Sequence, residues 1–313
     1  MVQKMPQYVI DMMADRAWRM EHFLWHEVRN GWLFFDAPTQ NALRGLGWEP
    51  PRPARRPGPN RPEVILDNNS GEDFLYMHRQ MIGAVNDRLA GDPQYPKIES
   101  WKSIPRPGDA DYPVPPAWDS GDNDLNNYLA DVKSDATFSS RFVPWEQQFT
   151  DPNYLRTVSL GELGARIEFS IHNQMHMRWC DVPQPGIRPD VDPSNPDAVD
   201  TSWDFPMYNW LGDTYSSHVN SVFWKLHGWV DDRISDWASA NGVVGEIPWK
   251  GTWVGKMPGH SMPHSFLSLM VHRATPAGSH DHHSHLNELI QAIRLVAKQG
   301  RFCRFYDEVS WPK

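Results

Sequence analysis

Residues 155–179 of the 313-residue chain read LRTVSLGELGARIEFSIHNQMHMRW. Apolar residues recur here at the three- and four-residue intervals of a helix, so the stretch is predicted to be helical. It carries His172 and His176, which are four residues apart and therefore project from one helical face. Such a pair can share a metal ion, although two surface histidines also fall at this spacing by chance.

A second pair of this kind lies near the start of the chain. Residues 8–30, YVIDMMADRAWRMEHFLWHEVRN, have helical spacing, are followed by Gly31 and carry His22 and His26. Two such pairs on two separate predicted helices indicate a shared role more strongly than either pair alone.

Each pair is followed by one histidine on a later predicted helix. His78 lies within residues 71–90 and His227 within residues 213–240, both in strongly apolar surroundings. A single histidine in such surroundings is typical of a hydrogen-bonded core residue. The order of a pair and a single, repeated once, instead predicts two three-histidine sites on four helices.

The remaining segments define the predicted architecture. Residues 49–62 and 92–123 are rich in proline and are predicted to be irregular loops, and a last helix is predicted near residues 284–299. These patterns predict one mainly α domain over residues 1–313, with an antiparallel four-helix bundle core that holds the paired site. The histidine-rich segment 258–313 has three open interpretations: copper delivery, a cover over the site, or a solvated loop.

Charge and hydropathy exclude several classes of protein. The formal net charge of −9 argues against general nucleic-acid binding, which needs a basic surface. No run approaches the roughly 18 apolar residues of a membrane span, and no secretory signal is visible. Cys180 and Cys303 are too few for a disulfide framework and are predicted to be reduced thiols. A cytoplasmic protein without membrane attachment is therefore expected.

The ligand type points to a class of metal. Sites for iron or manganese usually include Asp or Glu, whereas imidazole alone suits copper. Zinc stays chemically open, although two adjacent three-histidine sites would be unusual for zinc. The sequence therefore favours a dinuclear copper site.

Three stretches resemble the copper-binding motifs of type 3 copper proteins, the family of tyrosinases, arthropod haemocyanins and insect phenoloxidases. Residues 71–89, GEDFLYMHRQMIGAVNDRL, are similar to the copper A motif Gly-Glu-Leu-Phe-Tyr-Tyr-Met-His-Gln-Gln-Met. IHNQMH at 171–176 is similar to the copper B pair His-Asn-x-x-His. LGDTYSSHVNSVFWKLHGWVDDRI at 211–234 is similar to the closing copper B motif, except that Asn220-Ser221 stands where that family has Asp-Pro.

The resemblance implies an activity and a ligand set. The two copper ions would bind dioxygen as co-substrate and oxidise a small phenolic compound: a phenol would be hydroxylated, or a catechol or o-aminophenol oxidised to a quinone or quinone imine. Pigment or natural-product biosynthesis is one setting. The alternatives are a dioxygen carrier of haemocyanin type and an oxygenase of an aromatic amine nitrogen. A copper chaperone is a candidate partner, and the oligomeric state is left open. The implied ligands are His22, His26 and His78 for one copper and His172, His176 and His227 for the other.

The resemblance also implies two catalytic residues. In tyrosinases an Asn directly after the first copper B histidine, together with an upstream Glu, holds a water that takes the phenol proton. Asn173 and Glu168 are the candidates here, with a surface or capping carboxylate as the alternative for Glu168. His218 is expected to face solvent, with the substrate entrance as the alternative.

Overall fold

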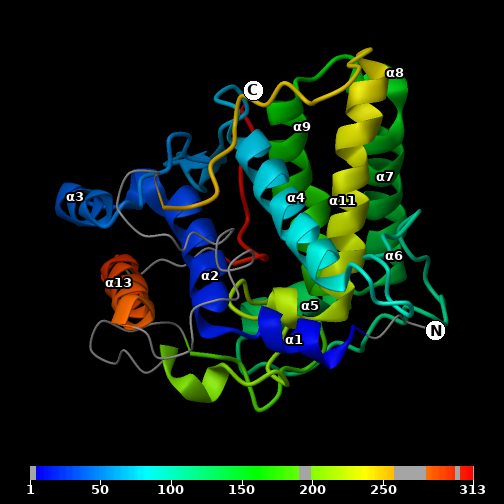
Figure 1. The fold of residues 1–313 in the computed structure, drawn as a ribbon. Helices are drawn as coiled ribbons and strands as arrows, with labels where there is room; N and C mark the ends of the chain where they lie inside the picture. Colours follow the sequence, from blue (N-terminus) through cyan, green and yellow to red (C-terminus); the bar gives the residue numbers. More distant parts are fainter. Residues whose placement is uncertain (1–4, 190–198, 257–279, 300–303, 313) are drawn as a thin grey trace.

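The computed structural model describes residues 5–189, 199–256, 280–299 and 304–312, and of residues 280–282 only the backbone. Within these ranges the chain is mainly helical, as predicted (Figure 1). One antiparallel pair of two-residue strands, β1 (Arg55–Arg56) and β2 (Glu63–Val64), interrupts the predicted loop at 49–62. The helices in chain order are α1 (Gln7–Met13), α2 (Arg16–Gly31), η1 (Trp32–Phe34), α3 (Ala37–Gly45), α4 (Ser70–Leu89), α5 (Asn123–Val132), α6 (Asp135–Thr137), η2 (Phe138–Phe142), α7 (Val143–Thr150), α8 (Pro152–Leu155), α9 (Leu160–Ile167), η3 (Glu168–His172), α10 (Asn173–Trp179), η5 (Thr201–Trp203), η6 (Ser217–Val219), α11 (Ser221–Ala240) and α13 (His280–Ala297).

The first predicted helix is two helices. The prediction of one helix over residues 8–30 is wrong at Ala14 and Asp15, where α1 ends and α2 begins. The Asp15 carboxylate accepts hydrogen bonds from the backbone N–H groups of Ala17 and Trp18, which would otherwise lack partners at a helix start. This cap fixes where α2 begins, so His22 and His26 both lie within it.

The stretch that carries the second histidine pair is also broken. Ser159 accepts from the backbone N–H of Glu162 and starts a new helical run at Leu160. The run then passes through η3, a turn of π-helix, before it continues as α10. A π turn adds a residue to the helical repeat and is frequent at functional sites, because it changes which side chains face inward.

Glycine allows the closest helix contact in the fold. A Cβ atom added to Gly71 at the start of α4 would lie 2.1 Å from the backbone nitrogen of Ala165, and one added to Gly164 would lie 2.2 Å from the Gly71 carbonyl oxygen. No larger residue fits between two backbones at such distances. Helices α4 and α9 therefore pack directly on one another, with α11 against α4, as Figure 1 shows.

The predicted fourth helix begins later than its sequence pattern indicates. Residues 213–220 form turns and the short η6, and α11 starts at Ser221, with Asn220 as its cap. The sequence did not predict the helices between Asn123 and Thr150. None of the helices in the described ranges is long and apolar enough to cross a bilayer.

Candidate metal centre

Six histidines from four helical segments meet in the interior. Each of them is at most 3% exposed. Two sets have ring nitrogens that all lie within 4.8 Å of one another, and neither set contains a carboxylate. The first set is His22, His26 and His78, and the second is His78, His172 and His227.

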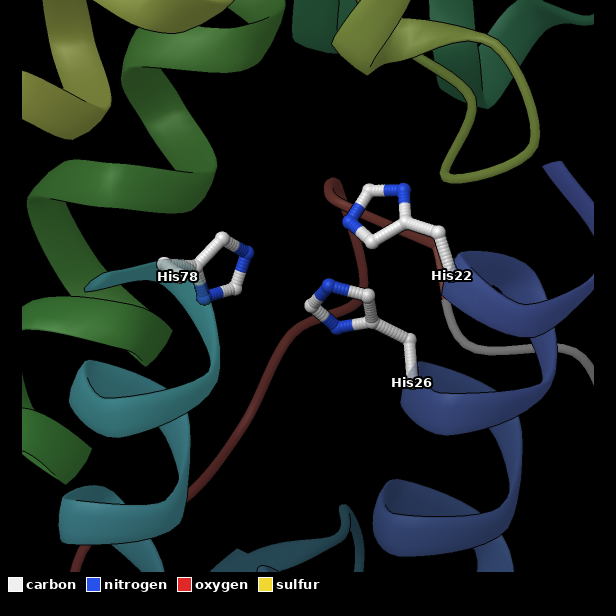
Figure 2. Close-up of side chains that lie close together, drawn as sticks. All are labelled: His22, His26 and His78. Atoms are coloured by element: carbon white, nitrogen blue, oxygen red, sulfur yellow. The ribbon is translucent and has the colours of Figure 1, made fainter. Parts of the chain in front are cut away.

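The first set joins α2 to α4. Figure 2 shows His22 and His26 projecting from one face of α2 toward His78 on α4. The ring centroids are 4.9 Å apart for His22 and His26, and 5.9 Å and 5.5 Å from these rings to His78. The structure therefore brings together these three residues, which helical spacing and position predicted to form one group.

The three histidines predicted for the second site also lie together, although His176 is outside the second set. Nε2 of His172 lies 3.0 Å from Nε2 of His227 and 3.1 Å from Nε2 of His176. His78, which belongs to both sets, stacks on His227 with ring centroids 4.4 Å apart, so the two predicted sites adjoin.

Main-chain oxygens determine where the ring protons lie in this region. Nδ1 of His78 is 2.9 Å from the Phe74 carbonyl oxygen, and Nδ1 of His227 is 2.9 Å from that of Phe223. Nδ1 of His176 is 2.8 Å from the Leu211 carbonyl oxygen. A carbonyl oxygen can only accept, so each Nδ1 carries the proton and each Nε2 has a free lone pair.

His172 is arranged in the same way. Its Nδ1 is 3.0 Å from Oδ1 of Asn173, and the Glu168 main chain is a second acceptor. The unprotonated Nε2 atom of His172 therefore faces the unprotonated Nε2 atoms of His227 and His176 at 3.0 Å and 3.1 Å, where no proton joins them. Such contacts repel in a buried site unless a cation lies among them, and three imidazole lone pairs are a metal-binding arrangement.

The first set has buried nitrogens that lack a partner. Among the described residues, Nε2 of His22 and Nε2 of His78 are buried without a hydrogen bond. An unpaired buried polar atom is costly, so each such atom in a folded protein needs an explanation. A metal ion held jointly with His26 would satisfy both.

Burial keeps these rings neutral. Desolvation lowers the pKa of His22 from 6.5 to about 3 and that of His172 to about 4. Burial also holds the pKa values of His26, His78, His176 and His227 well below 6.5. Neutral imidazole is the form that can bind a metal, so the buried rings are in the protonation state that a metal site needs.

We expect the metal-free protein to lose stability in weak acid. Below pH 6.5 these histidines take up protons in the unfolded chain but stay neutral in the folded protein. This difference persists down to about pH 4 for His172 and about pH 3 for His22. Stability therefore falls as pH falls, by up to about 1.4 kcal/mol per pH unit for each such histidine. Urea unfolding of the metal-free protein at pH 8, 6.5, 5.5 and 5 measures this slope. An unchanged free energy of unfolding over that range would contradict neutral, buried histidines.

Residues of the segment before α11 and of its first turn accept hydrogen bonds from three of the six histidines. The Leu211 carbonyl oxygen accepts from His176, the Thr214 main chain accepts from His22, and Phe223 accepts from His227. Asp213 fixes this segment, because its carboxylate pairs with buried Arg188 at 2.9 Å and 3.1 Å. The quoted stretch 211–234 therefore supplies ligand supports as well as one ligand.

His218 does not face solvent. It is completely buried, which corrects the expectation from the sequence. Its Nδ1 lies 3.1 Å from Nδ1 of His22, and its Nε2 lies 2.9 Å from the Met13 carbonyl oxygen. Sequence spacing gave no signal for this contact, since α2 and η6 are far apart in the chain.

Glu168 lies in a buried ion pair. Its Oε1 and Oε2 accept from Nη1 and Nη2 of Arg29 at 2.7 Å and 2.9 Å, and both side chains are at most 1% exposed. Asn173 uses its side-chain oxygen on Nδ1 of His172, the ring nitrogen that does not face the other histidines. The catalytic roles of Glu168 and Asn173 stay predictions, and both groups already have structural partners. The alternative of a surface carboxylate for Glu168 is wrong.

A cavity of about 300 Å³ is lined in part by residues that contact the histidines, and the six histidines are not among its described lining residues. Its walls include Phe305, whose ring stacks on His176 with centroids 4.0 Å apart, and Thr214, which supports His22. Phe305 lies on the C-terminal stretch 304–312, which is fixed where Ser310 pairs with Glu63 of β2. The sequence gave no signal for Phe305, because the contact depends on how the tail docks.

Five of the seven histidines of the histidine-rich segment have side chains outside the described residues. Of its described part, His285 on α13 is buried and its Nε2 is 2.8 Å from Oε1 of Glu21. Burial raises the pKa of Glu21, and the His285 hydrogen bond opposes this change. The interpretation as a solvated loop is therefore wrong for His285, while copper delivery and a cover over the site stay predictions.

No family model matches the chain, and no curated protein matches it either.

Proposed function

We propose that this protein is a type 3 copper oxidoreductase that oxidises a small phenolic substrate with dioxygen. One copper would be held by His22, His26 and His78, and the other by His172, His176 and His227. The four helical segments that carry them would form the four-helix core of that family. The observation that carries the proposal is the pair of short contacts at the unprotonated Nε2 of His172, 3.0 Å from Nε2 of His227 and 3.1 Å from Nε2 of His176.

The donor set favours copper over other metals. Six imidazoles without a carboxylate fit copper, whereas iron, manganese and magnesium usually recruit oxygen ligands. A copper pair can pass two electrons to dioxygen. The protein's part is to hold neutral rings in fixed orientations through the Phe74, Leu211 and Phe223 carbonyl oxygens.

The cavity that Phe305 lines is the candidate site for an aromatic substrate. Phe23, Trp210, Phe305 and Tyr306 line it, and flat apolar walls bind aromatic rings. For a catechol or o-aminophenol, two electrons and two protons would leave the substrate, with dioxygen as their acceptor.

A dioxygen carrier is the second candidate. The observation that favours it is the coverage of the histidines: none is more than 3% exposed, and Phe305 stacks directly on His176. Such a site admits dioxygen more readily than a phenol. Steady-state oxygen consumption with tyrosine, catechol, o-aminophenol and an aromatic amine separates a carrier from an oxidase and from an amine oxygenase.

We expect the protein to bind two equivalents of copper. Copper-loaded protein treated with hydrogen peroxide should develop a strong near-ultraviolet charge-transfer band, which requires both ions in one site. Copper titration and an absorption spectrum measure the two properties. Binding of fewer than two equivalents, or two equivalents without the band, would overturn the proposed function.

A further inference from the structure

His218 belongs to neither set of candidate ligands, yet it lies completely buried beside one of them. Residues of α1 and α2 make three contacts with its ring. Its Nε2 is 2.9 Å from the Met13 carbonyl oxygen, its Nδ1 is 3.1 Å from Nδ1 of His22, and Trp18 stacks on its ring with centroids 5.6 Å apart.

The Met13 carbonyl oxygen, at one end of this chain of hydrogen bonds, determines which ring nitrogens carry protons. The Met13 carbonyl oxygen can only accept, so Nε2 of His218 carries a proton. His218 is completely buried, and burial keeps its imidazole neutral, with a single proton. Nδ1 of His218 is therefore an acceptor, and Nδ1 of His22 donates to it.

The consequence for His22 is a defined tautomer. With its proton on Nδ1, its Nε2 has a free lone pair, and this is the buried nitrogen that lacks a partner. The Thr214 main chain also accepts from His22.

We propose that His218 is a positioning residue for His22: by accepting the Nδ1 proton, it orients the ring and presents Nε2 to a metal ion. His78, His176 and His227 each rely on a main-chain oxygen for this purpose, whereas His22 relies in addition on a side chain. Partners of this kind fix ligand orientation and strengthen metal binding. The role in metal binding rests on the proposed function, but the tautomer does not.

Two substitutions separate hydrogen bonding from shape. His218→Phe keeps a ring to stack on Trp18 but has no acceptor. His218→Asn is smaller but places Oδ1 near the position of Nδ1, so it can still accept from His22. If the hydrogen-bond acceptor matters, His218→Asn should preserve the His22 tautomer that His218→Phe removes.

The tautomer is measured directly by ¹⁵N NMR of histidine-labelled, metal-free protein. We expect His22 to have a bare Nε2 in wild type and in His218→Asn, and the Nε2-protonated form to appear in His218→Phe. A wild-type tautomer in His218→Phe, or its loss in folded His218→Asn, would overturn the proposal. Because Asn is tested separately, misfolding of the Phe variant leaves the question decidable.

Copper titration gives the second measurement. We expect His218→Phe to bind one of its two copper ions about 10- to 100-fold more weakly, the range typical for loss of a ligand's outer partner. The ion at His172, His176 and His227 should bind as in wild type, which also reports that the variant is folded. Equal affinity for both ions in His218→Phe and wild type would contradict the role in metal binding. Failure of wild type to bind copper would reject the proposed function, while the NMR measurement would still test the tautomer.

Discussion

Replacing His227 with Ala is expected to abolish the near-ultraviolet band of the peroxide-treated protein and all oxidase activity. His227 is the residue where both sets of histidines meet, 3.0 Å from His172 through their Nε2 atoms and stacked on His78. Its loss removes one proposed ligand and also the ring on which His78 stacks. The remaining second site, with two imidazoles, should bind copper more than about 100-fold more weakly, beyond the cost of losing an outer partner.

A control variant must lose buried packing on the same helix, as His227→Ala does, without losing a proposed ligand. Val230 lies one turn further along α11, is buried and carries no ligand atom. Val230→Ala should lower stability by roughly 1–3 kcal/mol, the usual range for point mutants, and keep two equivalents of copper. Copper titration and thermal unfolding of both variants make the comparison. If Val230→Ala lost as much copper as His227→Ala, the effect would be one of folding, and the ligand role would be rejected.

Breaking the Arg29–Glu168 pair is expected to be strongly destabilising. Glu168→Gln leaves the Arg29 guanidinium buried without its carboxylate, which typically costs about 3–5 kcal/mol. Arg29 also donates to the Ser70 carbonyl oxygen at 2.7 Å, so the pair joins α2, α4 and η3. Chemical denaturation of wild type and variant measures the change in free energy of unfolding.

Two controls identify the cause. Glu162→Gln, on α9, removes a partly exposed pair with Arg166 and should cost less than about 1 kcal/mol. The double variant Arg29→Met with Glu168→Leu removes both charges and should recover much of the loss. If Glu168→Gln were as stable as Glu162→Gln, the buried pair would not be a major stabilising contact.

The same variant tests the catalytic role predicted for Glu168. A structural pair predicts that hydroxylation of a monophenol and oxidation of a catechol fall together in Glu168→Gln. A proton-accepting role predicts selective loss of hydroxylation. The ratio of the two rates on tyrosine and catechol decides between these outcomes.

Periodicity predicted α4 and the helical character of residues 16–31, 160–179 and 221–240, because long amphipathic patterns survive most tertiary contexts. It failed at Asp15 and Ser159, where a side chain caps the backbone and starts a new helix. Periodicity also predicted that the fourth helix begins at Asp213, before its true start. The Asp213 carboxylate binds Arg188 and stabilises an irregular segment there. In each case a polar contact outweighed a continuous apolar pattern.

The sequence by itself determined which histidines would meet. An i, i+4 pair projects from one helical face whatever the surroundings, and the repeated order of pair and single placed all six on long helical stretches. The protons of His78 and His227 are set within their own helices, by carbonyl oxygens four residues earlier. Only the tertiary structure decided the rest: the Leu211 carbonyl oxygen and His218 set the protons of His176 and His22, burial keeps the rings neutral, and the carboxylate of Glu168 is committed to Arg29. These contacts join segments up to about two hundred residues apart, and side-chain spacing along one helix carries no information about them.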